Sequence, residues 1–184
     1  ELVSVGLTAV AARRHGQRRP DLAAKVVGDA LVLALVLSIL TGAFGHLFLD
    51  QLFAIEHTSP EVTALGKQYL GMYLYGAPLV FGFFTVDSAF RASGDTRTPL
   101  ALLVVSVTAA LALDPVLIMG LFGAPRLGIA GAAVSMLITR LATLVAGLII
   151  LHRRGMVHFG RVSMATVSTI VRIGLPTALS ASAT

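Results

Sequence analysis

Apolar residues fill long stretches of this chain that no charged residue interrupts. Twenty residues without a formal charge separate Asp29 from Asp50, and nineteen separate Lys67 from Asp87. About twenty helical residues cross the hydrocarbon core of a bilayer, which is roughly 30 Å thick. The pattern therefore predicts membrane-spanning helices, and Pro78 favours a kink in the second of them.

Two later stretches are as long, but each contains one charge, Asp114 in the first and Arg140 in the second. Residues 1–12 have the pattern of the tail of an earlier helix, and residues 162–184 that of the start of a later one. Four complete helices are expected, at residues 28–49, 65–90, 99–121 and 128–151.

Loop residues indicate where two of these helices begin. Thr58 with Glu61 three residues later forms a candidate capping box. Thr98 before Pro99 is a candidate N-cap with proline at the first helical position.

Composition agrees with a membrane protein of the all-α class. Hydrophobic residues make up 56% of the chain and charged residues 12%, against roughly 25% charged residues in soluble domains. We expect a polytopic transmembrane helix bundle. The absence of cysteine excludes disulfides and thiolate metal sites. Because the chain opens on Glu1 and its last apolar segment is too short to cross a bilayer, we expect a piece of a longer protein.

Lysine and arginine fall mainly in alternate loops. Lys67 and Arg126 lie in loops expected on one side of the membrane. The loops expected on the other side hold eleven basic residues: Arg13, Arg14, Arg18, Arg19, Lys25, Arg91, Arg97, Arg153, Arg154, Arg161 and Arg172. The positive-inside rule assigns these loops to the cytoplasm, so we expect a multi-pass protein of the cytoplasmic (inner) membrane, with Asp50, Glu56 and Glu61 outside. Since the basic residues alternate with spans, nucleic acid is not an expected partner.

Three motifs follow one another in the second half of the chain. The first is the loop Arg91, Ala92, Ser93, Gly94, Asp95, Thr96, Arg97, Thr98, Pro99. The second is Leu113, Asp114, Pro115, and the third is Gly128, Ile129, Ala130, Gly131, Ala132, Ala133. In this order the motifs are similar to those of multidrug and toxin extrusion (MATE) transporters, in which they join helices four and five, lie in helix five, and open helix six. Residues 11–16 and 172–176 also resemble the end of helix two and the start of helix seven.

The resemblance implies a twelve-helix transporter with two six-helix lobes around a central cavity. Residues 1–161 would belong to the N-terminal lobe, and residues 162–184 would begin the C-terminal lobe. It also implies export of an organic cation or drug in exchange for H⁺ or Na⁺, by a single full-length chain without a cofactor.

Asp114 is the first candidate for ion coupling. It lies fifteen residues after Pro99, roughly 22 Å into the span, where an ionised carboxylate costs about 2.5–3.5 kcal/mol by insertion scales. Protonation, pairing, ion binding or a wet cavity would each reduce that cost. The residues alone leave two functions open, a carboxylate that stabilises the backbone at Pro115 or a coupling group. The resemblance favours coupling, because the helix-five aspartate of the family is implicated in it.

Two neighbours bear on the coupling ion. MATE relatives often have an asparagine four residues before the aspartate, but here that position is Ala110. Since Na⁺ prefers several hard oxygen ligands, the alanine favours proton coupling. Ser135 is expected at a similar depth, either as a partner of Asp114 or hydrogen-bonded to a backbone carbonyl.

Three other polar residues fall inside or beside spans. Arg140 should face the bundle interior or snorkel inward, with a carboxylate from another helix as its expected partner. Like Ser135, it is also a candidate neighbour of the cavity or ion site. Asp87 and Arg91 are spaced for an ordinary pair near the cytoplasmic surface. His46 is expected to be hydrogen-bonded near the outer interface, with no second histidine at metal-ligand spacing.

Other classes of function remain as alternatives. A flippase for lipid-linked saccharides shares the helix arrangement, but it tends to have more basic residues in its cavity. A membrane-embedded enzyme would need convergent catalytic groups, and none is evident. A packing role for an inert fragment is the third. The chain has no Walker motif, so transport would depend on an ion gradient.

Overall fold

The chain is helical throughout the part that the structure describes. The computed structural model describes residues 2–55 and 59–181. Its helices in chain order are α1 (Leu2–Gly16), α2 (Pro20–Leu47), α3 (Leu49–Ile55), α4 (Pro60–Tyr75), α5 (Ala77–Ala92), α6 (Arg97–Met119), the short 3-10 helix η1 (Leu121–Gly123), α7 (Ile129–Arg153) and α8 (Met164–Ala181). No strand occurs among the described residues, and the expected all-α class is confirmed.

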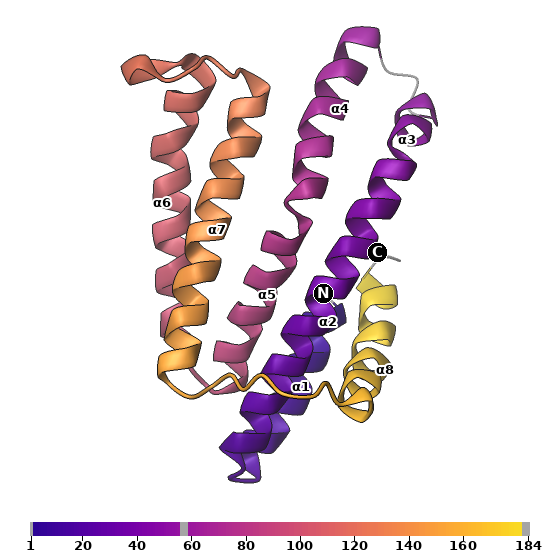
Figure 1. Ribbon diagram of the computed structural model, residues 1–184, viewed down its shortest axis with the longest axis vertical. Helices are drawn as coiled ribbons and strands as arrows, with labels where there is room; N and C mark the ends of the chain where they lie inside the picture. The colour runs from indigo at the N-terminus through magenta and orange to yellow at the C-terminus, as the bar shows by residue number, and fades with distance from the viewer. Residues whose placement is uncertain (1, 56–58, 182–184) are drawn as a thin grey trace.

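The long helices stand roughly side by side as a bundle (Figure 1). α6 and α7 form an antiparallel pair at one edge, and α7 also packs against α5. α2 packs against α5 and α1, while α8 packs along α1. The division of the chain into lobes at residue 161 stays a prediction.

Four segments are long and apolar enough to cross a membrane. Three are the single helices α2, α6 and α7, and the fourth is the pair α4 and α5 taken together. α6 and α7 begin and end within two residues of the expected bounds. These segments correspond to the four expected spans if the bent pair is counted as one span, and their bounds as membrane spans stay a prediction.

The fourth span is broken near its middle. α4 and α5 meet at Gly76 with a bend of 53°. Pro78 has no backbone N–H to donate to the preceding turn, so the helical hydrogen bonds cannot run on through this point. The N–H groups of Leu79 and Val80 donate instead to the Gly76 carbonyl at 2.9 and 3.2 Å. The predicted kink is confirmed, and it is a full break between two helices.

The first span begins earlier than expected, at Pro20 in place of residue 28. Proline suits the first helical position, and Asp21 in the first turn complements the positive end of the helix. As a result Asp29 lies inside the helix and not at its end. Side-chain charge was therefore a poor marker of this boundary.

Ser59 caps α4, with its hydroxyl accepting from the Val62 N–H at 3.4 Å. Thr58, expected in a capping box there, lies outside the described residues, as does Glu56.

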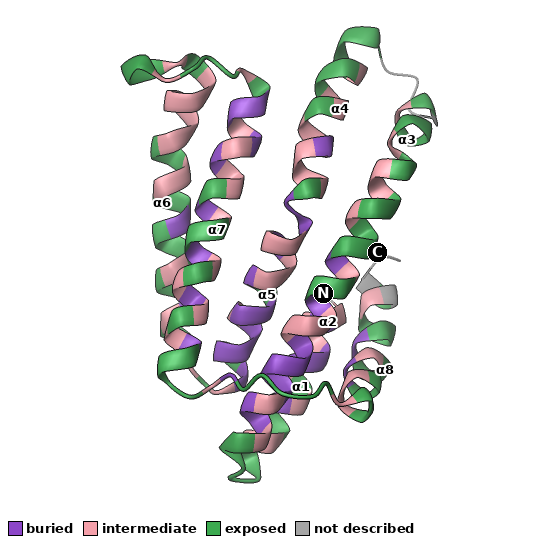
Figure 2. Cartoon of the chain, in the orientation of Figure 1, coloured by how far each residue is buried: buried purple, intermediate pink, exposed green. Residues whose placement is uncertain are grey.

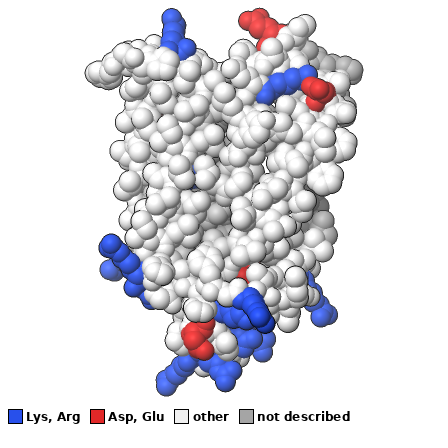
Figure 3. Space-filling model, in the orientation of Figure 1, with Lys and Arg blue, Asp and Glu red and all other residues white. Residues whose placement is uncertain are grey.

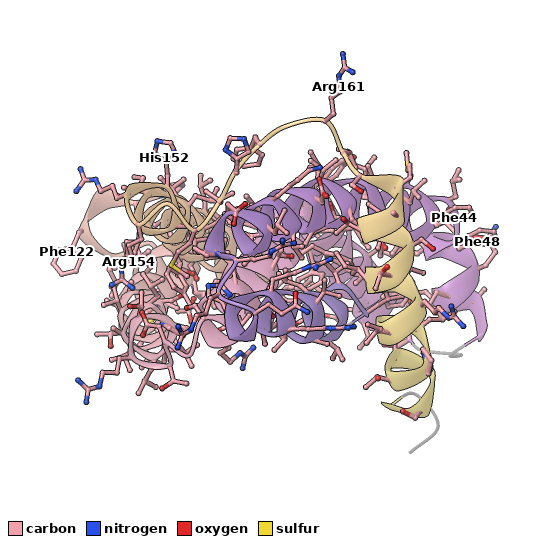
Figure 4. All side chains as sticks on the ribbon, turned by 90° about the horizontal axis from the view of Figure 1, so that it is seen from below. Phe44, Phe48, Phe122, His152, Arg154 and Arg161 are labelled. Carbon is pink, nitrogen blue, oxygen red and sulfur yellow. The ribbon has the colours of Figure 1, made fainter. Side chains whose placement is uncertain are left out.

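The most buried residues lie in the half of the bundle where α1, α2, α5 and α8 meet (Figure 2). Phe90, Leu7, Leu151 and Ile170 are fully buried there. The outer surfaces of the spans carry large apolar side chains, such as the stacked rings of Phe44 and Phe48, which project away from the bundle (Figure 4). An apolar outer surface suits a lipid environment.

Charged side chains gather at the two ends of the bundle (Figure 3). One end, formed by residues 13–25, 91–97 and 153–161, is called here the basic end. The opposite end carries Arg126 and an ion pair of 2.7 Å between Lys67 and Asp50. The band between the ends is almost free of charge on the visible face.

α6 and α7 approach closely at Gly131. A Cβ atom placed there would lie 2.6 Å from the Leu117 carbonyl oxygen of α6, whereas a Cβ at Gly71 of α4 would meet nothing within 4 Å. We expect Gly131→Ala to lower the free energy of unfolding by about 1–3 kcal/mol, because backbones must move apart.

The matched control is Gly71→Ala, which should leave stability equal or slightly higher, since alanine favours a helix interior. Thermal unfolding of the two detergent-purified variants checks this prediction. Equal melting temperatures would contradict the close approach of α6 to α7.

Candidate functional site

The candidate site lies between α6 and α7, near the opposite end of the bundle. Asp114 belongs to the last part of α6, one residue before Pro115, and Ser135 to the second turn of α7. The Ser135 hydroxyl donates a hydrogen bond to the Asp114 carboxylate. The same hydroxyl lies 3.3 Å from the Ala132 carbonyl oxygen. The Ser135 hydroxyl is therefore within reach of both expected partners, the Asp114 carboxylate and a backbone carbonyl.

A second polar contact joins these helices at the basic end. Arg154, which follows α7, donates to the Asp95 carboxylate at 2.6 Å. Asp95 precedes Asp114 by nineteen residues, and Arg154 follows Ser135 by nineteen. The two contacts therefore fix one antiparallel register and lie roughly 28 Å apart along the helices.

Hydroxyl groups lie between the two contacts. Ser106 of α6 and Thr139 and Thr143 of α7 are buried and line a groove of about 350 Å³ between the helices. Thr139 donates to its own helix at Ser135, at 3.0 Å, and Thr143 donates to Thr139 at 2.6 Å. In this register Ala110 lies opposite Thr139. A threonine oxygen therefore lies near the level at which relatives have an asparagine.

The first motif is a loop organised around the Asp95 carboxylate. One oxygen accepts from the N–H groups of Arg97 and Thr98, both at 3.0 Å. The other accepts from the Thr98 hydroxyl at 2.5 Å and from Arg154. These bonds satisfy free N–H groups in the first turn of α6.

The remaining residues of this motif have local structural functions. Gly94 has a φ of +84°, which favours glycine. Arg91 forms the expected pair with Asp87. Thr96 and Arg97 are exposed and Pro99 is buried in the first turn of α6. The motif therefore builds a tight turn and a helix start, and none of these residues reaches the Asp114 site.

The predicted N-cap at Thr98 is wrong. α6 begins at Arg97, and the Thr98 side chain donates to Asp95 where a capping side chain would accept. The Asp95 carboxylate takes the capping function because it reaches two backbone N–H groups from outside the helix.

Hydrogen bonds change the proton affinity of Asp95. Bonds from the Thr98 hydroxyl and N–H, and then from Arg154, hold its pKa well below the usual value near 3.8. The Arg154 guanidinium also lies 5.9 Å from the centre of the buried Phe90 ring. Figure 4 shows Arg154 at the basic end of α7.

The predicted carboxylate partner of Arg140 is absent from the described residues. The guanidinium lies over the Phe83 ring of α5, 4.4 Å from its centre. Its Nη1 atom is buried and has no hydrogen-bond partner there. The described carboxylates at membrane depth are elsewhere, with Asp114 bonded to Ser135 on the α6 side of α7.

Sequence reasoning missed Asp29 as a buried residue. Its side chain is 3% exposed, and its Oδ2 atom has no partner among the described residues. The adjoining Gly28 packs against the backbone of His158, whose N–H donates to Ala24 at 3.0 Å. Pro20 could have indicated that Asp29 lies within a helix, because a helix that starts at Pro20 places Asp29 in its third turn.

Among the described residues, no three or more His, Cys, Asp or Glu side chains come together as a metal-binding group. The His46 ring packs against the Tyr75 ring with centres 4.4 Å apart, and it has no hydrogen bond in that part of the structure. The hydrogen bond expected for His46 is therefore not found.

An apolar helix bundle with a polar site inside it is typical of a membrane transporter. Residues 2–116 match the sequence model of the MatE family. The chain therefore belongs to this family, whose members are transporters and not enzymes.

Individual relatives agree with the family match. The chain is 29% identical over 152 residues to a probable multidrug resistance protein, YoeA, of Bacillus subtilis, covering 83% of this chain and 33% of the relative. It is 32% identical over 154 residues to a FAD transporter of Shewanella oneidensis, covering 82% and 34%. The chain thus spans about a third of the length of these relatives.

A solved structure has the same fold. The inward-facing conformation of a multidrug resistance MATE family transporter of the MOP superfamily superimposes with a TM-score of 0.84 at 25% identity, over 97% of this chain and 41% of that one.

Replacing Asp95 tests the loop. We expect Asp95→Ala to lower the free energy of unfolding by about 1–2 kcal/mol, because N–H groups at the start of α6 lose their acceptor. Asp21→Ala, at an exposed carboxylate in the first turn of α2, is the control and should cost less. Thermal unfolding of the purified variants measures both. Equal losses would show that Asp95 is no more than a surface charge.

The same variant tests the lowered pKa of Asp95. A carboxylate whose pKa is depressed by folding stabilises the protein above its usual pKa, and that contribution is lost as pH falls below it. The stability difference between wild type and Asp95→Ala should be constant from neutral pH to about 5 and should shrink below the usual value of 3.8. Melting curves across this range check it, and a difference that grows in acid would contradict it.

Proposed function

We propose that this chain forms part of an antiporter that exports organic cations in exchange for H⁺. The observation that carries the proposal is the Asp114 carboxylate within a membrane span, bonded to Ser135 of the neighbouring helix. An ionised carboxylate at this depth is costly unless it is paired or solvated, and its one hydrogen-bond partner among the described residues is a neutral hydroxyl.

Competition between a proton and the cationic substrate for Asp114 couples the transport of one to the transport of the other. An ionised Asp114 attracts a cationic substrate, and protonation removes that charge. Protons entering from outside therefore expel the cation, and the cation cannot rebind until the proton leaves toward the cytoplasm. The linkage is reciprocal, because bound cation lowers the proton affinity of the carboxylate by the same factor.

Ser135 suits this exchange because its hydroxyl has two acceptors. It donates to Asp114 when the carboxylate is ionised, and the Ala132 carbonyl at 3.3 Å offers an alternative when a proton or cation occupies the carboxylate. The backbone need not move for this change. A rotating hydroxyl lowers the cost of the charged state without preventing its neutralisation.

The oxygen atoms near Asp114 favour H⁺ over Na⁺ as the coupling ion. Ala110, one turn before Asp114, supplies no ligand, and the Thr139 hydroxyl opposite it donates to the Ser135 carbonyl at 3.0 Å. A proton needs only the carboxylate, whereas Na⁺ prefers several hard oxygens at once. Proton coupling is therefore the mechanism we propose, in a cytoplasmic membrane with the basic end inside.

Efflux of a fluorescent cation tests the proposal in vesicles that contain the full-length transporter. We expect efflux to follow an imposed proton gradient without sodium, and Asp114→Asn to abolish it because asparagine cannot exchange a proton. Asp50→Asn, in the exposed pair with Lys67, is the matched control and should retain efflux.

Two results would contradict the proposal. Efflux that requires sodium would reject the coupling ion but retain the site. Unchanged proton-driven efflux in Asp114→Asn would reduce Asp114 to a structural residue beside Pro115.

A further inference from the structure

A small cavity lies between α1 and α8 at the basic end of the bundle. Its volume is about 180 Å³, and its lining residues are Ala9, Val10, Arg13 and Arg14 of α1 with Thr169 and Ile173 of α8. Water takes up roughly 30 Å³ per molecule in the liquid, so a phosphate group fits within this space. The cavity is separate from the Asp114 site, which lies between α6 and α7 near the opposite end.

Two packed helices form the walls of this cavity. α1 and α8 run side by side (Figure 1), and they meet closely on the membrane side of the cavity. A Cβ atom at Gly6 of α1 would overlap the Ile170 carbonyl of α8, and one at Gly174 would overlap the Leu2 carbonyl. The close approach fixes one helix against the other, so the cavity does not depend on the conformation of a loop.

The lining changes from apolar to basic along α1. Arg13 and Arg14 follow Ala9 and Val10 by one turn, about 6 Å nearer the basic end. Ile173 lies on the membrane side as well, because α8 runs away from the basic end. This order matches a lipid, whose charged headgroup lies at the membrane surface with apolar chains below it.

Protein carboxylates do not neutralise the two arginines in the part of the chain that the structure describes. Neither Arg13 nor Arg14 forms an ion pair there, and Arg14 donates to the neutral side chain of Gln17 at 3.2 Å. Asp87 and Asp95 at the same end are paired with other arginines. Both guanidinium groups therefore retain N–H donors, which suit phosphate oxygens.

We propose that this cavity binds an anionic phospholipid of the cytoplasmic leaflet. The two arginines hold the phosphate, and the lipid carbons next to it cover Ala9, Val10 and Ile173. A soluble phosphate would contact the arginines but leave the apolar part of the cavity uncovered, so charge and apolar surface together favour a lipid. The inference goes beyond the antiport function and does not depend on it. Because both helices line the cavity, the lipid bridges α1 to α8, where the predicted second lobe begins.

Lipid binding to the full-length transporter, purified in detergent and freed of lipid, tests the proposal. Phosphatidylglycerol and phosphatidylcholine with the same fluorescent acyl chain are titrated with the protein, and fluorescence anisotropy measures the affinity for each. We expect the wild type to bind phosphatidylglycerol about tenfold more tightly, because the arginines repel the cationic group of choline. The double variant Arg13→Gln/Arg14→Gln should lose this preference.

The matched control is Arg18→Gln/Arg19→Gln, which removes two exposed arginines that follow α1 but do not line the cavity. It should retain the preference for phosphatidylglycerol. A second variant, Ala9→Leu, fills the apolar part of the cavity without changing the charge. Ala9 is exposed, so the fold should tolerate leucine, and binding of phosphatidylglycerol should weaken severalfold.

Three results would overturn the proposal. Equal affinity of the wild type for the two lipids would do so, even if the arginine variants cannot be purified. An equal loss of the preference in both double variants would show that a diffuse positive surface attracts the lipid and that the cavity does not. Displacement of phosphatidylglycerol by a similar concentration of glycerol 3-phosphate would show a site for soluble anions.

Discussion

The fixed antiparallel register of α6 on α7 is the constraint on which the site depends. Ser135 meets Asp114 near one end, and Arg154 meets Asp95 at the other. Equal spacing along both helices makes the contacts compatible with each other, and a slip by one residue would break both. The loop at Asp95 is far from the carboxylate at Asp114, yet it helps to hold that carboxylate opposite its hydroxyl partner.

α7 connects α6 to the rest of the bundle. One side of the helix carries small and hydroxyl residues toward α6, and another carries Arg140 and Gly147 toward α5. The two intramembrane charges are consequently separated by the body of one helix. Both halves of the broken span, α4 and α5, pack on α7, and the break at Gly76 itself lies against Leu137 of α7.

The sequence located the four long apolar segments, because apolar length depends on local composition. Depth along the helices placed Ser135 level with Asp114, but it left open whether the serine bonds to the carboxylate or to a backbone carbonyl. Charged residues were a poor guide to where helices begin, because a charged side chain can lie inside a helix that starts earlier. Asp29 was taken for the end of an apolar stretch, although Pro20 allowed an earlier start and packing buries the carboxylate. The Phe83 partner of Arg140 could not be predicted, because it depends on how α5 packs against α7.

The central claim is that proton and cation compete for Asp114. Proton release on cation binding tests it most directly, measured in weakly buffered solution over several pH values with the purified full-length transporter. The account predicts that the wild type releases protons when the cation binds, with the release per bound cation rising toward one as the pH is lowered, and that Asp114→Asn releases none. Cation binding without proton release, or equal release from both proteins, would contradict it.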